Sequence, residues 1–208
     1  MQRKSSEVTK KDLLLLLAII FFLILILKLG DRLVYGWGYP PIKQLLIDAT
    51  PFPSGWIADE IDTDFPPSAP WTTGRDEIEY ARRQIYSNPI LGYGGSATII
   101  LQRFRNPSAA SKYFQREVSL EFRDTDWNTP WIVPENLKFE SVTADRYQYA
   151  CSQEGEPSLA KPRCVYVAQY DVYVIELYIG IYDAKAISYE DLIPIFEAID
   201  QKMSKLRW

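Results

Sequence analysis

The longest uninterrupted apolar run in the chain, LLLLLAIIFFLILIL, occupies residues 13–27. It contains no charge and no proline, and a helix that is apolar on every side needs an equally apolar surrounding. Fifteen helical residues span about 22 Å, less than the roughly 30 Å hydrocarbon layer of a bilayer. Flanking charged side chains can extend the span by reaching for the interface. The pattern predicts a transmembrane helix over residues 13–29, with the lipid bilayer as its first partner.

A cleaved signal peptide is the alternative interpretation of this run. Such a peptide ends in small residues at a cleavage site, whereas here the run continues into Lys-Leu-Gly-Asp-Arg, with no cysteine for lipid attachment. We therefore favour an uncleaved signal anchor. Basic residues collect before the span and predict a cytoplasmic N-terminus and an extracytoplasmic domain in the cell membrane; they are Arg3, Lys4, Lys10 and Lys11.

The changes in composition along the chain predict four segments. Residues 1–12 form a cytoplasmic N-terminus and residues 13–29 the anchor. Residues 30–50 are interrupted by glycines and prolines and form a linker or stalk. Residues 51–208 are long enough for one domain with a well-buried core.

Beyond the linker, alternating apolar positions and β-branched residues predict a sheet. Residues 77–86 suit a helix or a strand. The strand is favoured because Asn-Pro and Gly-Tyr-Gly-Gly then separate it from the next β-rich run as a hairpin. In the last candidate every second residue is apolar, so that face meets a core. The strand candidates are residues 77–86, 97–104, 146–151, 164–170 and 172–182.

Helical periodicity appears twice in the same region. Asn106 and Pro107 supply an N-cap and a first helical residue for a helix that reaches about Phe122. Ser188 and Asp191 resemble a capping box before an amphipathic C-terminal helix. The fold class predicted is α+β, with the transmembrane helix followed by an antiparallel sheet packed by about two helices on one face, a two-layer sandwich. This order is similar in outline to the small exported α+β sandwiches of the PsbP and Mog1 type, as an analogy of architecture.

The chain has two cysteines, Cys151 and Cys164, which flank a polar loop. Two reduced thiols are the alternative, but a cysteine pair in an exported domain favours a disulfide bond. We predict that these two residues are joined and that the bond is structural. There is no Cys-x-x-Cys motif for zinc or thioredoxin chemistry.

The residue inventory excludes several functions. The chain has no histidine, which removes imidazole acid–base catalysis and every Ser-His or Cys-His nucleophile. Residues 31–208 carry 18 lysines and arginines against 25 acids, a net charge of −7, which argues against nucleic-acid binding. The acidic loops at 59–64 and 124–126 lack the glycine and distal glutamate of an EF-hand, so we predict solvated acids rather than a calcium site. A glycosidase pair of carboxylates stays open, but no two acids stand out.

Tryptophans in loops are the remaining candidates for a ligand or partner surface, because an aromatic ring in a loop is less easily explained by packing. They are Trp71, Trp127 and Trp131. We expect no enzyme activity, no cofactor and no metal site. The expected function is an anchored, extracytoplasmic interaction or accessory subunit of a membrane or cell-surface assembly, with a protein partner. The alternative is a membrane-tethered module that binds a small ligand or a carbohydrate.

Overall fold

The computed structural model describes residues 16–26, 39–63, 77–87, 94–125, 129–154 and 161–206. The chain divides into two units, residues 1–39 and 40–208. In the first unit, residues 16–26 form a helix whose large apolar side chains are exposed. No helix among the described residues has the length and hydropathy needed to cross a membrane. The other residues of the predicted span, 13–15 and 27–29, lie outside the described ones.

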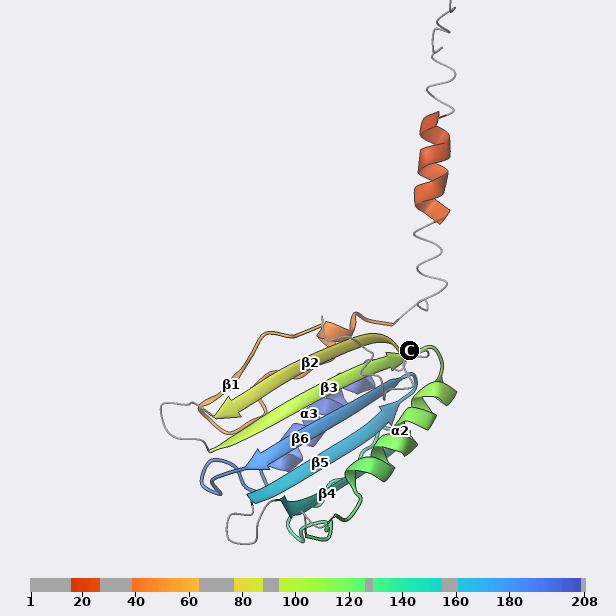
Figure 1. Ribbon diagram of the computed structural model, residues 1–208. Coiled ribbons are helices and arrows are strands. Elements are labelled where there is room, and N and C mark those ends of the chain that lie inside the picture. The colour runs from red at the N-terminus through yellow and green to blue at the C-terminus, as the bar shows by residue number, and fades with distance from the viewer. Residues whose placement is uncertain are drawn as a thin grey trace, which may run out of the picture. The chain divides into compact units, whose positions relative to one another are not determined.

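Within its described residues, the second unit is built on one six-stranded sheet with the order β1-β2-β3-β6-β5-β4 (Figure 1). Every neighbouring pair is antiparallel, so the predicted antiparallel sheet and its hairpins are confirmed. The strands are β1 (Trp56–Ala58), β2 (Glu77–Ser87), β3 (Gly95–Phe104), β4 (Arg146–Glu154), β5 (Lys161–Tyr170) and β6 (Tyr173–Ile181).

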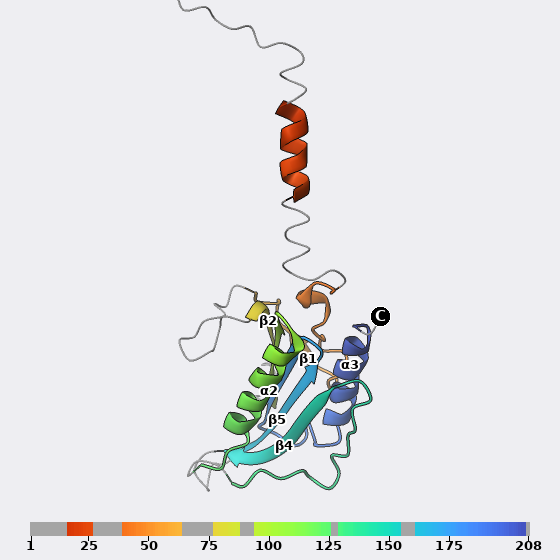
Figure 2. The same cartoon turned by 90° about the vertical axis from the view of Figure 1, so that its right-hand side faces the viewer.

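The two α-helices of this unit cover opposite faces of the sheet (Figure 2). On one face, α2 (Pro107–Glu121) packs Tyr113 and Phe114 against valines of β5 and β6. On the other, α3 (Leu192–Ser204) stacks Phe196 on Tyr166 of β5 at 4.7 Å between ring centroids. The expected two-layer sandwich with both helices on one face is therefore wrong, and the unit has three layers. The reason lies in the central strands, whose side chains are buried on both faces, so that each face needs its own cover.

The predicted start of α2 at Asn106 and Pro107 is confirmed. The capping-box bonds predicted for Ser188 and Asp191 are also present, but α3 itself begins only at Leu192, with Asp191 as its N-cap residue. The Asn106 side chain accepts a hydrogen bond from the Ala109 N–H at 2.9 Å, which caps α2. Before α3, the Ser188 N–H donates to the Asp191 carboxylate at 2.8 Å, and the Asp191 N–H donates to Ser188 Oγ at 3.4 Å. Pro194 then falls within the first turn of α3, where its missing N–H removes no intrahelical bond.

The segment before the sheet is packed against it. The 3₁₀ turn η1 (Ile42–Gln44) and the residues after it bury their apolar side chains. The Arg83 guanidinium of β2 donates to the Ile47 carbonyl at 3.0 Å and fastens this segment. The globular unit thus includes residues from Pro40 onward.

The outer edge of β4 is occupied by a neighbouring loop segment. The backbone of Ile132 exchanges two hydrogen bonds with that of Cys151, at 2.8 and 2.9 Å, and the Thr129 N–H donates to the Gln153 carbonyl at 3.0 Å. A strand edge whose donors and acceptors are paired in this way is closed to strand addition at those positions.

Candidate functional site

Of the three tryptophans selected from the sequence, Trp71 and Trp127 lie outside the described residues. Trp131 is half-buried and packs edge-on against Phe122, with ring centroids 5.3 Å apart. Its indole N–H donates to the Arg123 carbonyl at 3.4 Å. These contacts explain why part of the Trp131 side chain is buried.

The remainder of Trp131 forms a wall of a small cavity at the C-terminal end of α2. The cavity has a volume of about 120 Å³ and is bounded by the end of α2, the loop after it and strands β4 and β5. It combines an aromatic ring with guanidinium, carboxylate and hydroxyl groups, the mixture that positions small polar ligands. Its lining residues are Leu120, Glu121, Arg123, Thr125, Trp131, Ser152 and Arg163.

An ion pair stands in the wall of this cavity. The Arg163 guanidinium of β5 donates to Glu121 of α2 at 2.9 Å, and it also lies over the Tyr178 ring at 5.3 Å from the centroid. Burial raises the pKa of the Glu121 carboxyl, and the charge of Arg163 opposes that effect. The pair connects α2 to the sheet at the point where the cavity opens.

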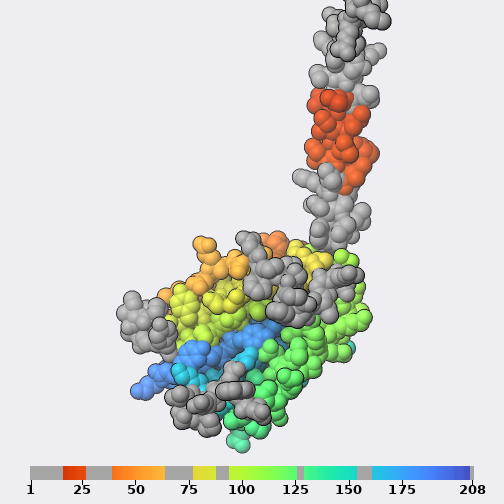
Figure 3. Space-filling model, viewed as in Figure 1, coloured from red at the N-terminus to blue at the C-terminus, as the bar shows by residue number. Residues whose placement is uncertain are grey.

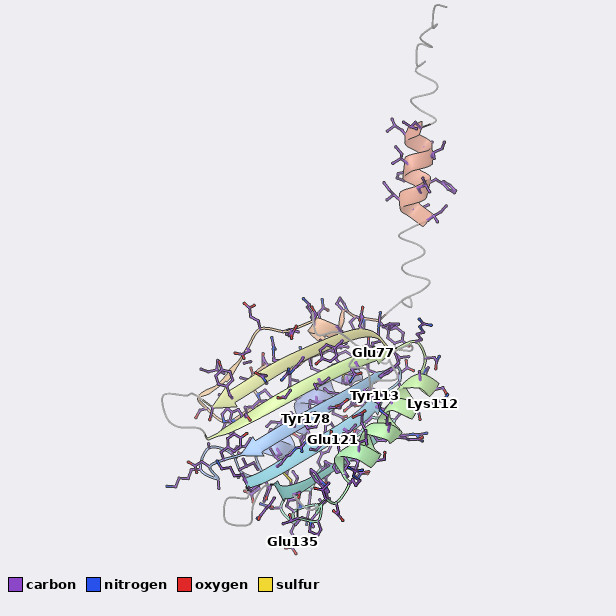
Figure 4. The ribbon with its side chains drawn as sticks, viewed as in Figure 1. Glu77, Lys112, Tyr113, Glu121, Glu135 and Tyr178 are labelled. Atoms are coloured by element: carbon purple, nitrogen blue, oxygen red, sulfur yellow. A yellow bond between two sulfur atoms is a disulfide. The ribbon has the colours of Figure 1, made fainter. Side chains whose placement is uncertain are left out.

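Behind the ion pair, a chain of hydrogen bonds continues between α2 and the sheet, and Figure 4 labels three of its members, Tyr113, Glu121 and Tyr178. The Tyr178 hydroxyl lies 3.2 Å from a Glu121 oxygen and 2.6 Å from Oε2 of Glu176. Glu176 Oε1 accepts from the Tyr113 hydroxyl at 2.8 Å and from Gln102 Nε2 at 3.2 Å. The polar groups at the cavity wall thus extend into the buried interface under α2.

Glu176 is the most buried carboxyl in this series of hydrogen bonds, with 3% of the residue exposed. Burial raises its pKa to about 7, and the charge of nearby Glu117 adds to the effect, against the hydrogen bonds from Tyr178 and Tyr113. Burial, followed by the charge of Glu176, also raises the pKa of both tyrosines. Burial therefore favours the protonated, uncharged forms of Glu176 and of the two tyrosines.

Sequence reasoning did not select Glu176 as a candidate. Within the predicted strand over residues 172–182 it is the one charged position, and its neighbours are apolar or aromatic. A single carboxyl at the centre of an apolar strand is a signal for a buried ionisable group, because Glu is rarely buried unless it is paired.

A second depression lies between the segment after η1 and the C-terminal half of α3. Its volume is about 360 Å³, and Lys202 and Lys205 of the end of α3 give it a basic side. Asp48 faces them while it accepts a hydrogen bond from the Thr50 N–H at 2.9 Å. It is lined by Ile47, Asp48, Thr50, Pro51, Ala198, Gln201, Lys202 and Lys205.

The predicted disulfide between Cys151 and Cys164 is confirmed. The two residues stand directly opposite each other in the β4–β5 pair, and each is 2% exposed. Cys151 directs its backbone N–H and carbonyl toward Ile132, so its side chain faces Cys164 across a non-hydrogen-bonded position. The bond joins an outer strand to the core of the sheet.

No protein-family model matches the chain, and no curated protein matches it. The chain is similar to the crystal structure of the extracellular domain of PknH from Mycobacterium tuberculosis, with a TM-score of 0.58 and 9% sequence identity. The match covers 82% of this chain and 100% of that domain. At this identity the likeness shows the fold alone.

Proposed function

We propose that the chain is a single-pass membrane protein whose extracytoplasmic domain acts by binding, as an interaction or accessory subunit of a membrane or cell-surface assembly. The observation that carries this proposal is the match over the full length of a known extracellular domain. The Cys151–Cys164 bond supports the same compartment, because disulfides persist in oxidising surroundings. The apolar run over residues 13–27 supports the anchor predicted for residues 13–29.

Exposed apolar side chains beside the cavity suggest where a protein partner binds. We define the Trp131 surface as Leu120, Trp131, Ile132 and Val133. Leu120 is 53% exposed, Ile132 62% and Val133 54%, while Leu120 and Trp131 border the same cavity. Apolar residues gathered beside an aromatic ring and arginines resemble the anchors of protein interfaces.

The predicted topology has a direct test. Protease added to intact cells is expected to remove the domain and to leave the first dozen residues protected, because the basic residues before Leu13 hold the N-terminus inside. Mass spectrometry of the remaining fragment identifies the protected end. A domain that survives the protease contradicts the orientation, and a mature protein that starts beyond Leu29 contradicts the anchor.

The partner has its own test with a matched control. We expect the full-length chain, purified in mild detergent, to retain a stoichiometric protein partner, and Ile132→Asp to lower that retention at least tenfold by placing a charge on the Trp131 surface. Val142→Asp is the control, because Val142 is 83% exposed and lies in a loop tied to α3 instead. A clean monomer, or equal retention in both variants, contradicts the proposal.

A module for a small polar ligand is the second candidate, and the cavity at the end of α2 favours it. The same purification distinguishes the two functions. A small molecule retained by the chain, visible as added mass in native mass spectrometry without a protein partner, favours the ligand module.

A further inference from the structure

Three glutamates between α2 and the sheet lie close enough to Tyr178 to act on its hydroxyl, and their partners differ. Glu117 pairs with the neighbouring Arg116, and Glu121 pairs with Arg163 at 2.9 Å. Glu176 instead contacts neutral groups, the hydroxyls of Tyr113 and Tyr178 and the amide of Gln102. Two of the three carboxyls thus have a guanidinium that stabilises the ionised form. Figure 4 shows Glu121, Tyr113 and Tyr178 on the same side of the sheet.

A count of hydrogens assigns the proton in this interface. The Tyr178 hydroxyl has one hydrogen but stands within bonding distance of two carboxyl oxygens, 3.2 Å from Glu121 and 2.6 Å from Glu176. With one hydrogen it can donate to only one of them, so both contacts are hydrogen bonds only if the other carboxyl is protonated and donates to the tyrosine oxygen. Glu121 is the anion because it is paired with Arg163. The order that satisfies every contact is a protonated Glu176 donating to Tyr178, which donates to Glu121.

We propose that Glu176 is a proton-binding site that keeps α2 seated on the sheet, and that loss of this proton loosens α2. Once Glu176 ionises, the Tyr178 hydroxyl lies between two anionic carboxylates and has one hydrogen to donate. Either its hydrogen bond with Glu176 or its hydrogen bond with Glu121 is then lost. A buried negative charge then stands near Glu117 and Glu121, which α2 itself carries. Movement of α2 away from the sheet relieves that repulsion and alters the cavity at its end. This inference does not rest on the proposed function.

The charged and titratable groups around Glu176 come from several elements. Its own strand supplies Tyr178, and α2 supplies Tyr113, Glu117 and Glu121. From β2, Tyr80 lies close enough to interact with its charge, and Tyr80 in turn interacts with Arg82 and Glu77 of the same strand. From β5, Arg163 acts through Glu121. Burial, and then the negative charge of Glu117, raises the pKa of Glu176 to about 7.

The raised pKa of Glu176 determines how the stability of the α2 interface changes with pH. The pKa is higher in the folded state than in the opened state, so the stabilisation is complete at acidic pH and falls as the pH rises toward 7. Once the folded-state carboxyl is ionised, no further loss follows. With a folded-state pKa of about 7, the equilibrium for opening α2 rises about tenfold between pH 6 and pH 8.

Hydrogen exchange of the α2 amides in the full-length protein in detergent tests the proposal. After correction for intrinsic rates, α2 is expected to exchange about tenfold faster at pH 8 than at pH 6. In Glu176→Gln the side chain cannot ionise, so this difference should fall to the part contributed by Glu77, which Glu77→Gln measures separately. Glu135→Gln is the control, since Glu135 is exposed in another loop, and it should behave like the unmodified chain.

Titration of the glutamate carboxyl carbons by NMR keeps the test decisive if Glu176→Gln does not fold. A carboxyl in contact with the Tyr113 ring protons should titrate with a midpoint above 6. Glu77 also has a pKa raised to about 7 by burial, so Glu77→Gln separates its contribution. A midpoint below 6 for Glu176, α2 exchange that does not change with pH, or an unaltered tenfold change in a folded Glu176→Gln overturns the proposal.

Discussion

Replacing Phe196 by alanine is expected to lower the free energy of unfolding by about 4 kcal/mol. Phe196 is 1% exposed and is the centre of the aromatic packing between α3 and the sheet. Its ring stacks on Tyr166 at 4.7 Å and contacts Phe139 and Tyr149 at 5.4 and 5.6 Å. Alanine leaves a cavity that three rings cannot close without breaking their own contacts, including the hydrogen bond that the Tyr149 hydroxyl accepts from the Phe139 N–H at 3.2 Å.

Denaturant unfolding followed by circular dichroism measures this loss. Glu197→Ala is the matched control, since Glu197 is the next residue of α3 and is exposed, and it should change stability by less than about 0.5 kcal/mol. A loss below about 1.5 kcal/mol in Phe196→Ala contradicts the account of α3 as the cover of this face.

Removing the disulfide is expected to have the next largest effect. Replacing Cys151 and Cys164 together by serine should lower the free energy of unfolding by about 3 kcal/mol, because the unfolded chain regains the freedom of the loop between them. The two positions are 13 residues apart and directly paired, so the native strands need no rearrangement when the bond is absent. Denaturant midpoints of the variant and of the reduced native protein measure the loss.

A reductant should bring the native protein to the stability of the double variant and leave the variant unchanged. Thiol titration of the denatured, unreduced chain should find no free thiol. Two free thiols would refute the bond, and equal midpoints for the variant and the oxidised protein would show that it does not stabilise the fold.

Local patterns in the sequence were sufficient for the elements themselves. The cap at Asn106 and the box formed by Ser188 and Asp191 are short-range arrangements, and the structure has both. The alternation of side chains along β6 is also a local pattern. It places Ile175 and Leu177 on one face of the strand and Glu176 on the other. The paired cysteines could be predicted because their chemistry depends on compartment and number more than on distant packing.

The positions of the helices could not be predicted in the same way. An amphipathic pattern indicates that a helix buries one side, but it does not indicate which face of the sheet the helix packs against. The clue was that β5 alternates Val165 and Val167 with Tyr166 and Ala168, so both of its faces are apolar. The network at Glu176 was equally hidden, since its members come from β3, α2 and β6, which only the fold brings together.

The face of the sheet that α2 covers carries polar side chains that packing against the helix does not require. Figure 3 shows α2, in green, beside atoms of β2 and β3 that remain in view. Strand register places Tyr80 and Arg82 of β2 on this face together with Thr98 and Gln102 of β3. The apolar contacts of α2 lie mainly toward β5 and β6, so the polar groups occupy the remaining width of the face.

The disulfide bond of Cys151 and its two backbone hydrogen bonds to Ile132 together have a thermodynamic consequence for recognition. Its sulfur is fixed to β5, while its backbone holds Ile132, so the segment that carries Trp131 is attached to the sheet through a covalently fixed residue. A surface that is already ordered loses little conformational entropy on binding, which raises affinity and slows dissociation without any added contact. If the proposed partner binds the Trp131 surface, reduction of the disulfide gives this segment more freedom before binding, and the affinity is expected to fall without a change in any residue of that surface.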